Sequence, residues 1–325
     1  MATPALTRPH CRTMQLLEKG FQMEAGWASG LDPAAVTPEL RQFVEAGGYS
    51  RPGSSAKKEI VQTLELLYND PVRNFYKGAV SRRLVADTQG HLSAGDLGGY
   101  TVVERAGLVG EVGGHQVITS PAPSAGPELL ALLRTMETLV TGTNSSAGGF
   151  ETSAYLARLT SAMEAVHRQQ RLLGDPASDL GDGEQLPDTA ARARLLASKQ
   201  NVAAVLAGGA DTGGLAPATD WLQGGTQVAV MDAKDVYVSL VLSLGGSLGS
   251  GQFSSGFLLN NALAGFDRGV LGPGVGPGRG GNMFREAARP LYRGAPVVTT
   301  NTEVGSNEYY LVPQYNHDPC VQAVC

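Results

Sequence analysis

The hydrophobic pattern centres on two short apolar runs, Val228–Met231 and Val236–Leu244, which flank a polar turn at residues 232–235. The second run is rich in β-branched and aliphatic residues, which are common in strands. Two such runs around a tight turn predict a buried hairpin. Thr226 stands at the front of the first run, where a hydroxyl residue is either a candidate nucleophile or only the start of a strand.

Helical spacing dominates the chain before this hairpin. Ile60, Leu64 and Leu67 recur at i, i+4 and i+7, which predicts a helix over residues 56–69 that ends before Asp70. Ser93 is placed to cap a short helical turn that contains Asp96. The other predicted helices cover residues 37–45, 72–88, 128–139, 151–173 and 188–198, and alternation predicts strands over 100–106 and 112–120. The mixture indicates an α+β protein.

Composition excludes several classes of protein. The chain has 325 residues and a net charge of −5 with no basic block, so it lacks the electrostatic footprint of a nucleic-acid-binding protein. No apolar run approaches the roughly 20 residues of a membrane helix. The first 20 residues lack the apolar core of a signal peptide. Length alone suits one large domain or two small ones.

Two short motifs and the three cysteines are candidate signs of other functions. Cys11, Cys320 and Cys325 form no C-x-x-C pair, so they do not predict a metal site. A G-x-G-x-x-G sequence begins at Gly276, but no predicted strand precedes it and prolines interleave it, which is typical of a flexible loop. Ser247 lies in a G-x-S-x-G sequence, which leaves a serine hydrolase as an open alternative, although the residues after it predict a loop where a nucleophile elbow needs a helix.

Six motifs occur in one order with consistent spacing, and together they resemble the γ-glutamyltransferase (glutathione hydrolase) family. They are F-Y-K-G at 75–78, L-S-A-G-D-L-G-G-Y at 92–100, S-P-A-P-S-A-G-P at 120–127, R-L-L-G-D-P at 171–176, G-F-L-L-N-N at 256–261 and P-L-Y-R-G-A-P at 290–296. The resemblance covers roughly residues 64–266, with a weaker similarity at 290–312.

This resemblance implies a fold and a chemistry. The family consists of N-terminal-nucleophile hydrolases with an αββα sandwich, and we expect this chain to carry it incompletely at both ends. The resemblance implies cleavage of a precursor before Thr226, whose hydroxyl then attacks a γ-glutamyl amide with its own α-amine as base. Residues 56–267 would form the γ-glutamyltransferase-like domain, with a large-subunit part to about 225 and a small-subunit part from 226. Residues 1–55 are expected to be a poorly patterned N-terminal segment, and residues 268–325 a Gly/Pro loop and a divergent C-terminal tail.

The chain departs from the family pattern where the substrate is held. The cut site reads Gly225-Thr226-Gln227, and one of its two possible alignments places Gly225, not Thr226, at the nucleophile. Family substrate-binding positions carry small, aromatic or cationic residues here: Gly245, Ala262, Ala264, Gly265, Tyr292 and Arg293. We therefore predict that no substrate-binding residue is retained and that activity is lost or impaired. A non-catalytic binding or regulatory subunit with a protein partner is the main alternative.

The resemblance also carries expectations on ligands and location. It implies glutathione or other γ-glutamyl compounds as substrates if the chain is active, and it implies no cofactor and no metal. The family is membrane-anchored and extracellular, but this sequence shows no segment that would direct the chain there.

Overall fold

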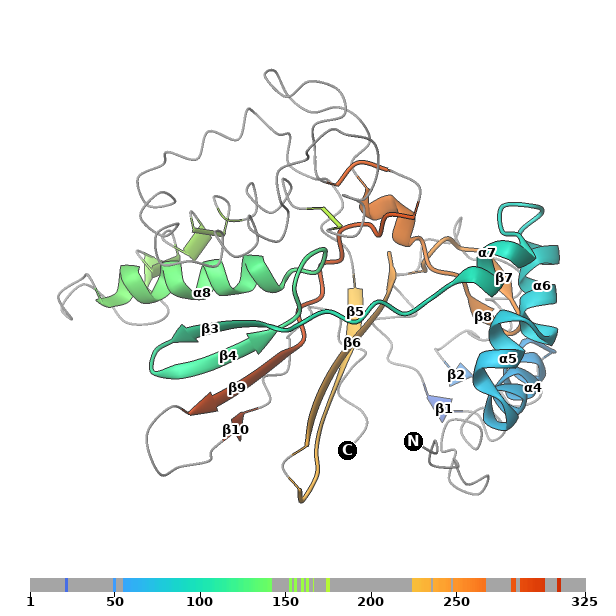
Figure 1. Ribbon diagram of the computed structural model, residues 1–325, viewed down its shortest axis with the longest axis horizontal. Coiled ribbons are helices and arrows are strands. Elements are labelled where there is room, and N and C mark those ends of the chain that lie inside the picture. The colour runs from blue at the N-terminus through green and yellow to red at the C-terminus, as the bar shows by residue number, and fades with distance from the viewer. Residues whose placement is uncertain are drawn as a thin grey trace. The chain divides into compact units, whose positions relative to one another are not determined.

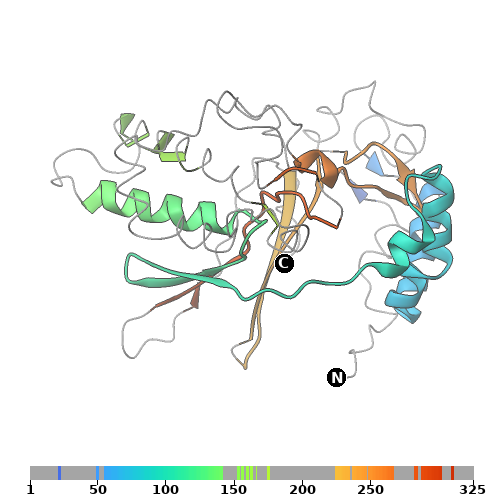
Figure 2. The same cartoon turned by 45° about the horizontal axis from the view of Figure 1, so that its top comes forward.

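The computed structural model describes residues 21–22, 49–50, 55–141, 224–234, 236–246, 248–266, 282–284, 287–301 and 309–310, with single positions between 152 and 175. The chain divides into two compact units. The first contains Met1–Val103, Leu244–Asn261 and Asn316–Cys325, and the second contains Glu104–Ser243 and Ala262–Tyr315. Helices and strands mix in the described residues, as expected for an α+β protein (Figures 1 and 2). No helix in these ranges is long and apolar enough to cross a membrane.

In its described residues the first unit contains four helices and two short strand pairs. Helix α4 (Ser55–Asn69) confirms the prediction for residues 56–69. Strands β1 (Phe21–Gln22) and β2 (Tyr49–Ser50) pair antiparallel, as do β7 (Phe253–Ser254) and β8 (Phe257–Leu258). The remaining helices are α5 (Pro71–Tyr76), α6 (Ala79–Asp87) and α7 (Ala94–Gly99).

The single helix predicted over residues 72–88 is wrong, because the chain breaks between α5 and α6. The break lies at Lys77 and Gly78, and Gly78 becomes the N-cap of α6. A Cβ on Gly78 would lie 2.7 Å from the Asn74 Cα, so only glycine allows the two helices to meet this closely. Asp70 caps α5 by accepting a hydrogen bond from the Arg73 amide at 3.0 Å. Periodicity alone does not reveal such a break.

The short turn predicted after Ser93 is confirmed as α7. The Ser93 hydroxyl accepts a hydrogen bond from the Asp96 amide at 3.1 Å, and the Asp96 carboxylate accepts one from the Ser93 amide at 2.8 Å. This reciprocal pair is a capping box. Hydrogen bonds from the Ser93 side chain and backbone lower the pKa of Asp96.

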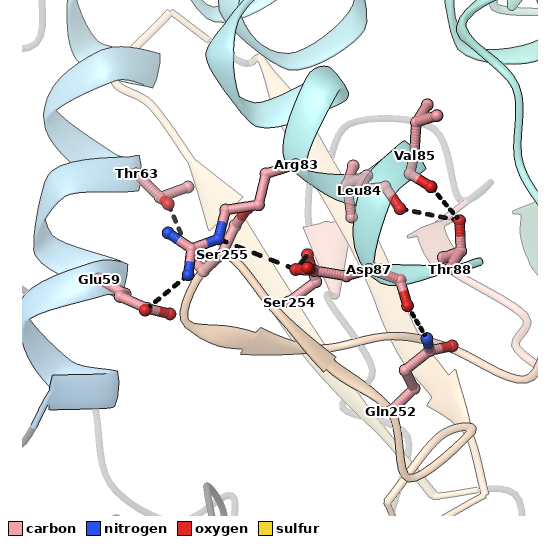
Figure 3. A network of polar contacts seen from close by, with 10 residues as sticks. All are labelled: Glu59, Thr63, Arg83, Leu84, Val85, Asp87, Thr88, Gln252, Ser254 and Ser255. Carbon is pink, nitrogen blue, oxygen red and sulfur yellow. Dashed lines mark hydrogen bonds and ion pairs between the residues drawn. The ribbon is translucent and has the colours of Figure 1, made fainter. Parts of the chain in front are cut away.

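The β7–β8 hairpin packs against α4 and α6 through a polar network (Figure 3). The Ser254 hydroxyl donates to Asp87 Oδ2 at 2.7 Å, and Gln252 Nε2 donates to the Asp87 carbonyl at 2.6 Å. The Thr63 hydroxyl donates to the Ser255 carbonyl at 2.7 Å, and this bond is buried. Residues almost 200 positions apart in the sequence therefore form one unit.

The hairpin turn fits against α4 because Gly256 has no side chain. Its φ is +86°, and a Cβ there would lie 2.2 Å from the Ile60 amide nitrogen. The neighbouring residue, Ser255, also has a positive φ. Both the backbone conformation and the close approach therefore require glycine at position 256.

We predict that Gly256→Ala destabilises the first unit by more than 1 kcal/mol, because the methyl group must push the turn away from α4 and strain a positive φ. Urea unfolding followed by circular dichroism would measure the loss. Gly251→Ala is the matched control, since Gly251 also has a positive φ but has nothing within 4 Å of its Cβ position. Equal losses in the two variants would contradict the packing argument.

The second unit contains a four-stranded antiparallel sheet in the order β10-β9-β4-β3 (Figure 1). Its strands are β3 (Leu108–Val112), β4 (His115–Thr119), β9 (Val297–Asn301) and β10 (Tyr309–Tyr310). The strand predicted over residues 100–106 is wrong, since these residues lie outside any strand. Gly113 and Gly114 both have positive φ and form the two-residue turn, which sets the pairing of Val112 with His115.

Helix α8 (Gly126–Thr141) confirms the helix predicted over residues 128–139 and packs on this sheet. Val117, Leu130 and Val297 form the buried core between them. A Cβ on Gly110 would lie 2.7 Å from a methyl carbon of Leu130, so the helix lies directly over β3 at this glycine. Figures 1 and 2 both show α8 running along β3 and β4.

A buried carboxylate connects three further segments of the second unit. Described positions between 153 and 166 are helical, as predicted for residues 151–173, and Gly174 and Asp175 follow outside the helix. The Asp175 side chain is fully buried, and it forms ion pairs with Arg105 and Arg289. The Arg289 amide also donates to Asp175 Oδ2 at 2.9 Å. The G-D-P sequence therefore ends a helix and also supplies the buried carboxylate that connects Arg105 and Arg289.

The hairpin predicted at the centre of the chain is present as β5 (Gly224–Met231) and β6 (Tyr237–Gly245). The prediction that it is buried is wrong. Along β6, half-buried and exposed residues alternate without interruption, and the exposed ones are aliphatic. The Asp232 carboxylate shapes the turn by accepting hydrogen bonds from the Lys234 and Val236 amides. Periodicity predicts the strands but not what covers them.

Some sequence predictions fall outside the described residues. They are the helices over 37–45 and 188–198, the Gly/Pro segment from 268 to 281, and all three cysteines. The division into segments 1–55, 56–267 and 268–325 also stays a prediction.

We predict that Asp175→Asn destabilises the second unit by about 3 kcal/mol, because removing one charge from a buried pair leaves two arginines uncompensated. Chemical denaturation of the purified chain would measure it. Glu111→Gln, on an exposed position of β3, is the control and should change stability by less than about 0.5 kcal/mol. A loss of similar size in both variants would show that Asp175 has no special role.

Candidate functional site

Thr226, the predicted nucleophile, lies on β5 in the second unit, and its side chain is exposed. Successive side chains of a strand point to opposite faces, so Thr226 and Gln227 face different ways. Val228 and Val230 share the face of Thr226, and both are exposed. The part of the chain that the structure describes places no hydrogen-bond partner on the Thr226 hydroxyl. The surroundings of this hydroxyl on its own strand are therefore aliphatic.

Ser239 positions the strand that carries Thr226. Gln227 Nε2 donates to the Ser239 hydroxyl oxygen at 3.1 Å, and the Val297 amide donates to the same oxygen at 3.2 Å. One hydroxyl group thus joins β5, β6 and the first residue of β9. Gln227 stands where one alignment places the family's histidine, and here it serves this structural contact.

The segment 290–296 leads into β9 and lies along the loop 120–125 that precedes α8. The Tyr292 amide donates to the Pro123 carbonyl at 2.8 Å, and the Ala125 amide donates to the Gly294 carbonyl at 3.3 Å. The Thr119 hydroxyl donates to the Pro296 carbonyl at 2.8 Å. Two of the six sequence motifs therefore lie side by side, although about 170 residues separate them.

Buried Asn282 fixes the start of this segment. Its Nδ2 donates to the Gly265 carbonyl at 2.7 Å, and its Oδ1 accepts a hydrogen bond from the Leu291 amide at 2.9 Å. Gly265 ends the short helix η3 (Ala262–Gly265), and a Cβ on it would lie 2.7 Å from the Leu291 carbonyl oxygen. Three of the positions predicted to bind substrate in the family, 262, 264 and 265, thus form a compact backbone turn without a charged side chain.

The family resemblance predicts a hydroxyl donor at the position where this chain has Tyr292. A Cβ on Gly294 would lie within 2.3–2.8 Å of the Tyr292 ring and hydroxyl, so the ring folds back over Gly294. The Tyr292 hydroxyl oxygen is buried and has no hydrogen-bond partner among the residues that the structure describes. Burial raises the pKa of the Tyr292 phenol. The aromatic ring therefore fills space that a serine would leave open.

The Asn260-Asn261 motif of the first unit has a structural role. Asn261 Oδ1 accepts a hydrogen bond from the Gly246 amide at 2.8 Å, and the Asn261 amide donates to the Leu244 carbonyl at 2.9 Å. Gly245 has a φ of +89°, and a Cβ on it would lie 1.9 Å from Asn261 Oδ1. No side chain fits at position 245 in this turn, so the substitution of glycine there is part of the local fold.

Ser247, the alternative nucleophile, lies outside the described residues. The residues that follow it form turns closed by hydrogen bonds from the Gly249 amide to the Gly246 carbonyl and from the Gly251 amide to the Leu248 carbonyl. Strand β7 comes next. A nucleophile elbow requires a helix at this place, so the local structure does not favour a serine hydrolase.

Comparison with known proteins agrees with this arrangement of motifs. A family model described as Gamma-glutamyltranspeptidase matches residues 11–308. The chain belongs to the γ-glutamyltranspeptidase family. It is 24% identical over 254 residues to the capsule biosynthesis protein CapD proenzyme of Bacillus anthracis, covering 77% of this chain and 44% of that protein. It is 27% identical over 253 residues to glutathione hydrolase 7 of Rattus norvegicus, covering 74% and 36%.

The fold of this family member also has a solved counterpart. The crystal structure of cephalosporin acylase from Bacillus halodurans matches with a TM-score of 0.62 at 17% identity, over 89% of this chain and 52% of that one. The predicted type of fold is thereby supported, while the four-layer sandwich itself stays a prediction. The chain spans less than half the length of the two curated relatives.

The structural roles of three residues in this γ-glutamyltranspeptidase-family chain do not follow from the sequence motifs. They are Ser239, Asn282 and Asp175. Ser239 reads as an ordinary strand residue, and Asn282 follows a Gly/Pro stretch that gives no structural signal. Asp175 stands in the G-D-P motif, where the sequence predicts only the end of a helix. A charged residue at such a position is the one sequence signal that could have indicated a buried ion pair. Each acts through contacts with distant segments, which one sequence does not reveal.

We predict that Tyr292→Phe raises the free energy of unfolding by about 1–3 kcal/mol, because it removes a buried hydroxyl group without a partner. Below the ordinary phenol pKa both folded and unfolded chains are neutral at this position. Above it the Tyr292 phenol of the unfolded chain loses its proton, while that of the folded chain keeps it because burial raises its pKa. The contribution of Tyr292 to the free energy of unfolding therefore falls as pH rises through about 10.

Urea unfolding at neutral and alkaline pH would check both effects. Tyr68→Phe, which alters a half-buried tyrosine on α4, is the matched control. A less stable Tyr292→Phe variant at neutral pH would show that the hydroxyl has a partner that stabilises the fold.

Proposed function

We propose that this chain keeps the structural framework of the γ-glutamyltransferases but has lost most or all of their γ-glutamyl hydrolysis and transfer. Glutathione and related γ-glutamyl compounds are the substrates that the family relationship favours for any remaining activity. Thr226 is the nucleophile in that case. Its hydroxyl oxygen would bond to the γ-carbonyl carbon, the C–N bond would break, and the freed amine would take the proton.

The observation that carries this proposal is the replacement of charged and hydroxyl groups around the substrate positions. A γ-glutamyl group brings an ammonium and a carboxylate, and each costs several kcal/mol to desolvate unless it is paired. Ala262, Ala264 and Gly265 offer no carboxylate to the ammonium. Tyr292 places an aromatic ring where the family motif has a small hydroxyl residue.

The surroundings of Thr226 support the same conclusion. Activation of a threonine hydroxyl needs a base within hydrogen-bond reach, and the developing oxyanion needs preorganised donors. The neighbours of Thr226 on its own face of β5 are the exposed Val228 and Val230. Loss of one oxyanion or charged contact typically lowers the rate by about 10²–10³-fold, so several losses leave little turnover.

A non-catalytic binding or regulatory role is the second candidate. The exposed aliphatic face of the β5–β6 hairpin favours it, because such a face is costly in water and typical of protein contacts.

We predict that the purified chain stays intact on a denaturing gel and does not hydrolyse a γ-glutamyl anilide above background. Thr226→Ala should behave identically, because the reaction has no working nucleophile to remove. An active glutathione hydrolase assayed in parallel shows that the assay detects turnover. Cleavage before Thr226, or anilide hydrolysis that Thr226→Ala abolishes, would overturn the proposal.

A further inference from the structure

Strand β3 forms one edge of the four-stranded sheet in the second unit (Figure 1). It pairs with β4 on one side, and no strand of the described residues pairs with it on the other. The two-residue turn pairs Val112 with His115, so the ladder hydrogen bonds to β4 use every second residue of β3, counted back from Val112. The backbone N–H and C=O groups of Val109 and Glu111 therefore point to the free edge.

A guanidinium without a carboxylate partner lies beside this edge. Arg134 stands on α8, and its Nη2 lies 3.3 Å from the position that a Cβ on Gly110 would take. Its Nε atom is buried and has no hydrogen-bond partner among the described residues. The ion pairs within the described part of the chain use Arg83, Arg105 and Arg289, and none includes Arg134. A partly covered, unpaired charge is costly, and a carboxylate that reached it would form a strong charge-assisted bond.

An antiparallel strand added to this edge would bring one side chain to the guanidinium. It would bond to Val109 and Glu111, so one of its residues would lie opposite Gly110. Residues opposite each other on neighbouring strands share a face of the sheet, with Cβ atoms about 4.5–5.5 Å apart. Gly110 faces α8, because its Cβ position meets Leu130 and Arg134. A carboxylate opposite Gly110 would therefore reach the Arg134 guanidinium, with no side chain of β3 between them.

We propose that the free edge of β3 binds an extended segment of a partner protein, with an acidic side chain opposite Gly110 that pairs with Arg134. In such strand addition, main-chain hydrogen bonds supply affinity and side-chain contacts supply selectivity. A second copy of this chain does not fit, because Leu108, Gly110 and Val112 on the α8 face of β3 carry no carboxylate. Two copies paired around Gly110 would also bring two Arg134 side chains together.

The two exposed residues of β3 define the neighbours of the acidic residue. Glu111 is exposed and favours a basic residue opposite it, while Val109, which is 53% exposed, favours an apolar one. In an antiparallel strand the residue opposite Glu111 comes first. The partner segment therefore reads basic, acidic, apolar from its N-terminus. This site uses no residue assigned to γ-glutamyl chemistry, so it goes beyond the proposed loss of activity and is tested separately from it.

The test is fluorescence anisotropy of a labelled synthetic peptide, rich in threonine and valine with a central Lys-Glu-Val, titrated with the purified full chain. We expect saturable binding, and about tenfold weaker binding of the same peptide with Lys-Gln-Val, which loses the charged bond to Arg134. Arg134→Gln should abolish this difference between the peptides. Arg73→Gln, at an exposed arginine of α5 in the first unit, is the matched control and should preserve it.

A second pair of variants tests the backbone contact. Val109→Pro removes an amide that points to the free edge but no ladder bond to β4, so it should weaken both peptides by about tenfold. Val109→Thr keeps the amide and should bind as the wild type does. Circular dichroism checks that the variants fold. If Val109→Pro does not fold, hydrogen exchange decides, since the Lys-Glu-Val peptide should slow exchange of the Val109 and Glu111 amides in the wild type.

Three outcomes overturn the proposal. The first is no saturable binding of the Lys-Glu-Val peptide to the wild type. The second is equal affinity for the two peptides, or a preference for glutamate that persists in Arg134→Gln. The third is binding that neither Val109→Pro weakens nor the exchange of the edge amides reports.

Discussion

The buried carboxylate of Asp175 is the contact on which the second unit depends most. It pairs with Arg105, which precedes the first strand of the sheet, and with Arg289, which precedes the segment 290–296. The Arg289 amide bonds to the same carboxylate. The charge is compensated from two sides, and its cost of desolvation is offset only while all three segments stay together. The Asp175 carboxylate thereby holds three segments together: the residues before β3, the segment that contains Gly174 and Asp175, and the residues before the 290–296 motif.

Two other polar side chains, buried Asn282 and half-buried Ser239, extend this framework. Asn282 joins η3 to Leu291, and Ser239 joins the central hairpin to β9. These ties use side-chain groups that face into the protein and that lie outside the motifs of the family. The family positions expected to face the substrate carry alanine, glycine and tyrosine. The polar side chains of Asp175, Asn282 and Ser239 therefore stabilise the fold. The candidate nucleophile, Thr226, lies next to exposed valines on its own strand.

Local features were predictable from the sequence, and features that depend on distant segments were not. The helix α4 follows from the spacing of Ile60, Leu64 and Leu67, and the Ser93–Asp96 capping box is readable in four residues. The break at Gly78 depends on the close approach of Asn74, and the position of β3 depends on the turn conformation of Gly113 and Gly114. For the site, the sequence left Thr226 as either a nucleophile or only the start of a strand, and the structure places it inside β5, which begins at Gly224. The sequence did not reveal which face of the hairpin is covered, because that depends on packing partners.

The central claim is that a γ-glutamyltranspeptidase-family framework is present without working γ-glutamyl chemistry. Intact-mass spectrometry of the chain after incubation with a γ-glutamyl anilide tests it in one measurement. The account predicts a single species at the mass of the uncut 325-residue chain, with no adduct. Two fragments that meet at Thr226, or a γ-glutamyl adduct on the fragment that begins with Thr226, would contradict it.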